Sequence, residues 1–172
     1  NTLGPIKLVV HAAADPLDYT AIADLTASAA VNQFDLQAGG LLRLSQSCLA
    51  GMRARGAGQF IFIGSTAQRG APPKGMAAYA AAKAAGTSII RSMGLENAPY
   101  GIRANIVSPH FLSGGLNSHV TEKVRKLAAA QTPMRRLAEF DEIAQVVCFL
   151  ASDAGRFING HDLLVDGGVT MV

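Results

Sequence analysis

Short apolar runs alternate along the chain with longer stretches in which apolar residues recur at helical spacing. The runs cover residues 6–10, 59–63, 103–107 and 162–165, and turn-forming residues such as Pro109 bound them. Runs this short and this uniformly apolar predict buried β-strands. Because helices separate the strands, we expect an α/β fold with a doubly wound parallel sheet that helices cover on both faces.

The helical stretches differ in how clearly their sequence predicts a helix. The pattern through residues 22–29 is weak, whereas residues 34–52 carry a clear apolar stripe of Phe34, Leu41, Leu44, Cys48 and Met52. The alanine-rich segment 76–92 has high helix propensity. Two further helices are expected at residues 120–130 and around the apolar stripe 143–150.

Composition narrows the class of protein. The 172 residues are 49% hydrophobic and 16% charged, which predicts one globular domain over residues 1–172. With a net charge of +3 and no long basic run, we expect neither nucleic acid nor a membrane as a partner. Cys48 and Cys148 lie in helical patterns, so we interpret them as small core residues of a cytoplasmic protein without a disulfide or a metal site.

The candidate chemistry begins with Tyr79 and Lys83, one helical turn apart. Residues at this spacing share a helix face, and a nearby ammonium is expected to lower the pKa of a tyrosine below its usual value of about 10. Such a phenol can exchange a proton with an alcohol or a ketone. By itself the pair also fits a half-buried tyrosine beside a solvated lysine.

The strand exits supply further candidates, since ligands of open α/β sheets bind at the carboxyl ends of the strands. Ala12 and Ala13 follow the first strand, and their small size lets a flat ligand approach the backbone. Ser65 follows the second strand about ten residues before the Tyr79 helix. We therefore expect its hydroxyl to face Tyr79 across one crevice and to hold a substrate oxygen.

Together these residues resemble the classical short-chain dehydrogenase/reductase family over nearly the whole chain, from about residue 6 to residue 169. The matches are Tyr79 and Lys83 for the Tyr-x-x-x-Lys motif, Ser65 for the catalytic serine, Asn32 in a Val-Asn context for the catalytic asparagine, residues 101–105 with Pro109 for Gly-Ile-Arg-x-Asn and its proline, and residues 160–168 for the C-terminal Gly-x-x-x-x-Val-Asp-Gly-Gly.

The resemblance implies an oxidoreductase that moves hydride between NAD or NADP and a secondary alcohol or ketone. Tyr79 would be the acid/base, Lys83 would lower its pKa and hold the nicotinamide ribose, and Ser65 would polarise the carbonyl. Asn32 would hold a water that links Lys83 to solvent. The cofactor contacts so implied are Ala12, Ala13, Tyr79, Lys83, Pro109 and Leu112. The family also forms homodimers and homotetramers.

Several positions depart from the family pattern. The Asn-Asn-Ala-Gly of the first strand exit is His11-Ala12-Ala13-Ala14, and His110 replaces the usual glycine after the proline. The spacing from Ser65 to Tyr79 is one residue longer than the family's commoner spacing, which makes Thr66 a competing candidate.

The largest departure is that the family's first half, with its glycine-rich phosphate loop, has no counterpart before residue 6. We therefore expect an incomplete, truncated domain with a partial Rossmann-type sheet. Its first strand would be a bare apolar edge prone to aggregation, and the chain as given would be inactive and bind little dinucleotide.

Two alternatives remain open. The related halohydrin dehalogenases lack the glycine loop but use arginine where this chain has Lys83, and a non-catalytic binding or structural fragment is the other alternative. The choice between NAD and NADP, the substrate, and dimer versus tetramer are not decided by the sequence.

Overall fold

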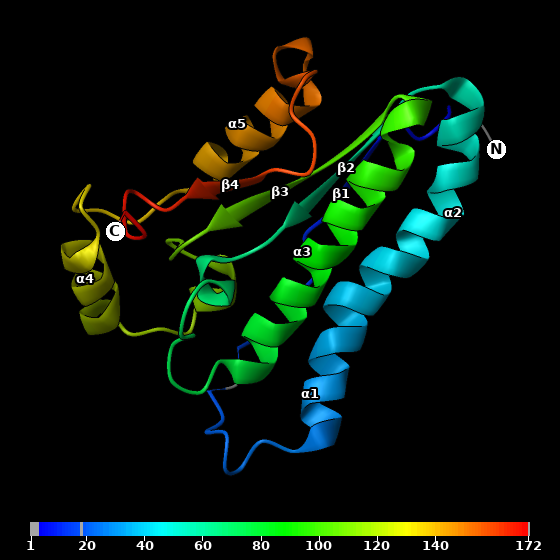
Figure 1. The fold of residues 1–172 in the computed structure, drawn as a ribbon. Coiled ribbons are helices and arrows are strands. Elements are labelled where there is room, and N and C mark those ends of the chain that lie inside the picture. The colour runs from blue at the N-terminus through cyan, green and yellow to red at the C-terminus, as the bar shows by residue number, and fades with distance from the viewer. Residues whose placement is uncertain (1–3, 18, 172) are drawn as a thin grey trace.

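The computed structural model describes residues 4–17 and 19–171, whose strands form one parallel sheet (Figure 1). The order along the sheet is β1, β2, β3, β4, so strands that follow one another in the chain are neighbours. The strands are β1 Leu8–His11, β2 Gly58–Ile63, β3 Ile102–Pro109 and β4 Asp162–Val165. This arrangement, with helices on both faces, confirms the predicted α/β fold.

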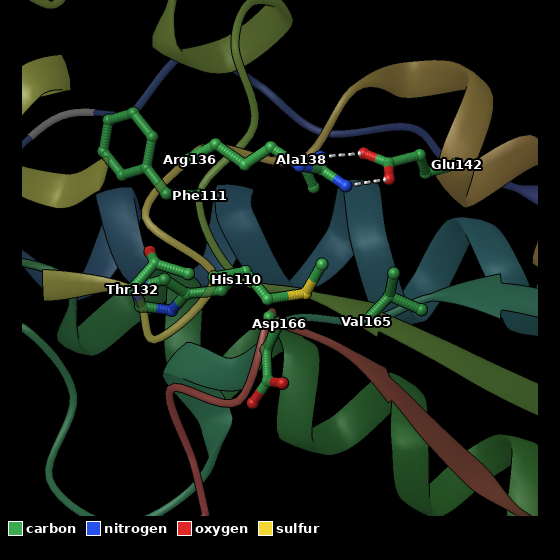
Figure 2. A pocket seen from close by; sticks show the side chains of 10 residues that line it. His110, Phe111, Thr132, Arg136, Ala138, Glu142, Val165 and Asp166 are labelled. Atoms are coloured by element: carbon green, nitrogen blue, oxygen red, sulfur yellow. Dashed lines mark hydrogen bonds and ion pairs between the residues drawn. The ribbon is translucent and has the colours of Figure 1, made fainter. Parts of the chain in front are cut away.

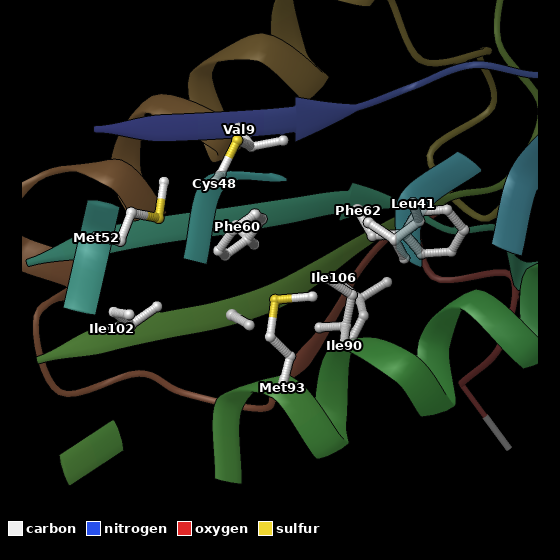
Figure 3. Packing of buried hydrophobic residues seen from close by; sticks show 11 residues of the cluster. Val9, Leu41, Cys48, Met52, Phe60, Phe62, Ile90, Met93, Ile102 and Ile106 are labelled. Atoms are coloured by element: carbon white, nitrogen blue, oxygen red, sulfur yellow. The ribbon is translucent and has the colours of Figure 1, made fainter. Parts of the chain in front are cut away.

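One face of the sheet is covered by two long helical segments. The first is a continuous run of α1 Ala27–Phe34, the π-helical segment η1 Asp35–Gly39 and α2 Gly40–Arg55, which ends at Gly56 with φ 66°. The second is α3 Ala77–Asn97. Their contacts with the sheet form the larger apolar cluster, shown in Figure 3, of Val9, Leu41, Cys48, Met52, Phe60, Phe62, Ile90, Met93, Ile102, Ala104 and Ile106.

The opposite face is covered by α5 Phe140–Ala151, which packs Ile143 and Leu150 against Ile61 and Val107. A reciprocal pair of side-chain-to-backbone hydrogen bonds between Glu139 and Glu142 caps the start of this helix. Helix α4 Glu122–Gln131 lies beside the carboxyl end of the sheet (Figure 1).

Two helical expectations need correction. The helix expected over residues 22–29 begins only at Ala27, because the Thr26 hydroxyl accepts a 3.2 Å hydrogen bond from the Ala29 N–H and fixes the start there. The apolar stripe is also broken. Phe34 is 50% exposed while Leu41 is fully buried, because the π-helical turns between them shift the helical phase. Leu44 is likewise 38% exposed.

Strand β1 lies at one edge of the sheet, as expected. Leu8 and Val10 are 38% and 42% exposed, whereas Val9 on the other face belongs to the core. In the described part of the chain, no helix has both the length and the apolar character needed to cross a membrane. Nor do residues 4–17 and 19–171 contain a cluster of three or more histidine, cysteine or acidic side chains suited to a metal.

Candidate active site

A cavity of about 1260 Å³ opens at the carboxyl ends of the strands. Ser65 reaches it from the exit of β2, and Tyr79 and Lys83 reach it from the first turns of α3. Residues between β3 and α5 close the far side. The cavity is large enough for a drug-sized ligand, since pockets of this kind commonly measure about 300–1,000 Å³.

Lys83 is the buried cation of the site. Its side chain is carried by α3 over the end of β2, where Nζ donates a 2.7 Å hydrogen bond to the carbonyl oxygen of Ile63 and lies 4.9 Å from the centre of the Phe62 ring. The residue is 2% exposed, and burial lowers the pKa of Lys83 to about 8. An ammonium has three donors, so two remain for a ligand.

Tyr79 lies beside Lys83, whose Nζ is 5.5 Å from the centre of the phenol ring. Burial raises the pKa of Tyr79 above its ordinary value, a hydrogen bond with the Ser65 hydroxyl opposes that rise, and Tyr19 adds to it. The expectation that Lys83 lowers the pKa of Tyr79 is therefore not met. Loss of hydration disfavours the phenolate more than the neighbouring groups favour it.

Ser65 stands at the turn that follows β2. Its side chain caps the short 3-10 segment η2 Thr66–Gln68 by accepting a 3.2 Å hydrogen bond from the Ala67 N–H. The competing candidate Thr66 also lines the cavity, but its Oγ1 shares a 2.8 Å hydrogen bond with Nδ1 of His110. Ser65 is thus the hydroxyl that influences the pKa of Tyr79, and Thr66 is the hydroxyl joined to the β3 exit.

The structure brings most of the predicted site residues together. Ala12, Pro109 and Leu112 line the same cavity as the three polar side chains. Ala13 is exposed and does not line it. Asn32 is exposed on α1 and is likewise absent from the lining, so the role expected for it has no support in its position.

Two polar residues near the site are buried: Gln37, which sequence reasoning missed as a functional candidate, and His11, which the sequence places at a strand end. Gln37 is fully buried in η1, which packs against α3, and its Oε1 finds no hydrogen-bond partner in the described residues. His11 is 6% exposed at the end of β1, and its Nδ1 is also unpartnered there. Burial, and then the charge of Lys83, lower the pKa of His11. One feature of the sequence could have identified Gln37 as a candidate. It is a polar residue at helical spacing between Phe34 and Leu41, on a stripe predicted to be apolar.

A second, much smaller cavity of about 70 Å³ adjoins the β3 and β4 exits (Figure 2). Arg136 and Glu142 close one side with paired hydrogen bonds of 2.7 and 2.6 Å, and His110 and Asp166 lie on the other. The space has room for ordered water, because one water needs about 10–15 Å³ of such accessible volume. His110 lines both cavities.

Comparison with known protein families gives a match over residues 1–170 to the family described as "Enoyl-(Acyl carrier protein) reductase". Among curated relatives, the chain is 38% identical over 148 residues to the vibriobactin-specific 2,3-dihydro-2,3-dihydroxybenzoate dehydrogenase of Vibrio cholerae, covering 80% of this chain and 56% of that protein. The chain spans about half the length of the first such relatives it matches.

Solved structures agree with the fold. A gluconate 5-dehydrogenase from Burkholderia cenocepacia, in complex with NADP and tartrate, superposes with a TM-score of 0.92 at 29% identity, over 99% of this chain and 67% of that one. A protein described as a dehalogenation enzyme superposes with a TM-score of 0.88 at 28% identity, over 96% of this chain and 69% of that one.

Proposed function

The chain belongs to the short-chain dehydrogenase/reductase family, and on that premise we propose that it is an oxidoreductase acting on a secondary alcohol or ketone of a small molecule, with NAD or NADP. We further propose that residues 1–172 form one domain. The observation that carries the proposal is that Ser65, Tyr79 and Lys83 line one cavity at the carboxyl ends of the strands.

In this proposal Tyr79 moves the proton. Its raised pKa keeps the phenol protonated near neutral pH, which suits donation to the oxygen of a ketone during reduction. Ser65, which lines the same cavity as Tyr79, holds and polarises the same oxygen. Lys83, whose Nζ lies 5.5 Å from the centre of the phenol ring, is the positively charged group beside this phenol.

The lining residues fit the nicotinamide end of a dinucleotide. Ala12 leaves space beside the β1 exit, Pro109 and Leu112 form an apolar wall, and Lys83 has donors left for ribose hydroxyls. When bound, the nicotinamide supplies or accepts the hydride. The neighbour solved with NADP supports a nicotinamide dinucleotide as cofactor. A homodimer or homotetramer and a cytoplasmic location remain predictions.

The test uses the full-length protein that contains residues 1–172 and follows NAD(P)H absorbance with a panel of ketones and alcohols. The panel includes the substrates named for the relatives, 2,3-dihydro-2,3-dihydroxybenzoate and gluconate. Tyr79→Phe is expected to lower kcat by roughly 10²–10⁴-fold, as loss of a general acid does. Tyr100→Phe, on an exposed tyrosine outside the cavity, is the matched control. Turnover that survives Tyr79→Phe, or no turnover with either cofactor, contradicts the proposal.

A second candidate, dehalogenation of a halohydrin, has the neighbour described as a dehalogenation enzyme in its favour. The lysine at position 83 is evidence against this function, because an arginine is expected at this position in such enzymes. Halide release from a halohydrin without any dinucleotide, abolished by Tyr79→Phe, would select this second function.

A further inference from the structure

A buried hydrogen-bond network joins the short turn that follows Ser65 to α3, β3 and β4. Its centre is Asp162, the first residue of β4, whose side chain is 3% exposed. Oδ1 of Asp162 accepts a 2.6 Å hydrogen bond from the Ser108 hydroxyl on β3. Oδ2 accepts hydrogen bonds from Gln68 Nε2 at 3.1 Å and from Arg69 at 3.0 Å. Arg69 supplies the charge that a buried carboxylate requires.

Gln68 extends this network to the helix that carries the proposed acid. Its Oε1 accepts a 3.0 Å hydrogen bond from the Thr87 hydroxyl, one turn beyond Lys83 on α3. The orientation of the amide follows from its partners, because Asp162 can only accept and the Thr87 hydroxyl can donate. Gln68 therefore spans from β4 to α3, and it lies three residues after Ser65 in the same short turn.

The backbone that leads into Ser65 lies against the same network. A Cβ on Gly64 would lie 2.5 Å from the Ser108 hydroxyl oxygen and 3.5 Å from Gln68 Nε2. Gly64 thus lets the chain pass close to these polar groups. Gln68 itself does not line the cavity, so it has no direct access to a substrate there.

We propose that Gln68 is a positioning residue, anchored by Asp162, that sets the distance between Ser65 at the β2 exit and Tyr79 on α3. The inference rests on the proposed function, because it assigns Gln68 a part in keeping Ser65 and Tyr79 on one substrate oxygen. A displacement of about 1 Å between reacting groups can cost about 10²-fold in rate. A network with every member hydrogen-bonded holds such a distance firmly.

The first experiment compares three variants on α3. Thr87→Val removes the hydroxyl that Gln68 accepts from while keeping side-chain shape, and Thr87→Ser restores a hydroxyl. Asn97→Leu removes buried hydrogen bonds of 2.7 and 2.8 Å at the far end of the same helix. Thr87→Val should lower kcat about tenfold or more with KM nearly unchanged. Thr87→Ser should recover the rate, and Asn97→Leu should destabilise the fold without lowering kcat.

A second readout does not depend on turnover. The NMR signal of the Tyr79 Cζ carbon, identified by its loss in Tyr79→Phe, reports the influence of the Ser65 hydroxyl on the phenol. The chemical-shift change in Ser65→Ala, which removes the hydroxyl, is the reference for complete loss of the contact. Thr87→Val and Gln68→Leu should reproduce most of it, and Asn97→Leu should leave the signal in place.

The outcomes separate the two proposals. Absence of turnover in the unaltered full-length protein, with the signal shifted as expected, contradicts the oxidoreductase function and leaves the positioning role standing. A signal unmoved in Thr87→Val and Gln68→Leu, while Ser65→Ala moves it, overturns the positioning role. If Ser65→Ala also leaves the signal unmoved, Ser65 does not act on Tyr79, and Gln68 has no such contact to position. This outcome also overturns the positioning role.

Discussion

The Lys83 ammonium donates a 2.7 Å hydrogen bond to the carbonyl oxygen of Ile63, and so joins the second turn of α3 to the last residue of β2. This places a positive charge in a site where the residue is 2% exposed. A buried charge with few partners destabilises the folded state. Because burial disfavours the charged form, it also lowers the pKa of Lys83 to about 8.

The stability of the chain should therefore rise with pH in a defined window. Between about pH 8 and 10.5, the unfolded chain holds a proton on Lys83 that the folded chain has released. The free energy of unfolding increases where the unfolded state binds more protons, so the full penalty is present below about pH 8 and disappears toward pH 10.5. The gain is about 3 kcal/mol.

The measurement is urea unfolding of the unaltered chain and of Lys83→Met across this window. Lys83→Met should lack the rise, so the difference in unfolding free energy between the two proteins should change by up to about 3 kcal/mol in favour of the unaltered chain as the pH rises. Lys74→Met, at an exposed lysine, is the control. Parallel pH dependences in Lys83→Met and the unaltered chain would contradict the burial of the charge.

Ser65 and Thr66 are adjacent hydroxyls that should differ in function. Ser65→Ala removes the hydrogen bond that lowers the pKa of Tyr79, so the pKa should rise further and kcat should fall by roughly 10²–10³-fold, as for loss of one oxyanion donor. Thr66→Val removes only the bond to His110 and should change kcat far less. A larger loss of kcat in Thr66→Val would make Thr66 the reacting hydroxyl.

Substitutions of Gln37 and of Asn32 should have different effects on kcat. Asn32 is exposed on α1, so Asn32→Ala should leave both the melting temperature and kcat within error of the unaltered chain. Gln37 is buried with an unpartnered amide oxygen, a group that water or a functional contact normally satisfies. Gln37→Leu should therefore lower kcat without unfolding the chain. A fall in kcat caused by Asn32→Ala alone would restore the original assignment.

Local patterns predicted the parts of the site that depend on neighbours in the sequence. Tyr79 and Lys83 share a face because one helical turn separates them, and Ser65 lies at a strand exit because a short apolar run ends there. The Asn32 assignment rested on a Val-Asn context within a helix, and it stays a prediction for a side chain that lies outside the cavity lining. The burial of Gln37 depends on the π-helical turns of η1, which change the helical phase and which no apolar spacing reveals.

The network around Asp162 could not be predicted from such patterns. Gln68 and Asp162 are 94 positions apart in the chain, and they meet only because the parallel sheet places the β2 exit beside β3 and β4. A polar residue at the start of a strand has the ordinary appearance of a surface residue. Its burial depends on the packed fold, as does the raised pKa of Tyr79.

The packing of α3 on β2 gives the last prediction. Gly86 faces the Phe62 ring, and a Cβ there would lie 2.5 Å from the ring's Cζ atom. Phe62 is fully buried and cannot move aside freely, so Gly86→Ala should destabilise the fold by about 1–3 kcal/mol despite a helix-propensity gain of about 1 kcal/mol.

Gly51→Ala on α2 is the matched control, because its Cβ would meet only the flexible end of Arg55 at 3.3 Å. It should raise the free energy of unfolding by up to about 1 kcal/mol. Since Lys83 Nζ also lies over Phe62, displacement of this ring in Gly86→Ala should disturb the proposed site and lower kcat as well. Thermal unfolding and kinetics of both variants measure these effects. Equal stabilisation by Gly86→Ala and Gly51→Ala would show that α3 does not sit this close to β2.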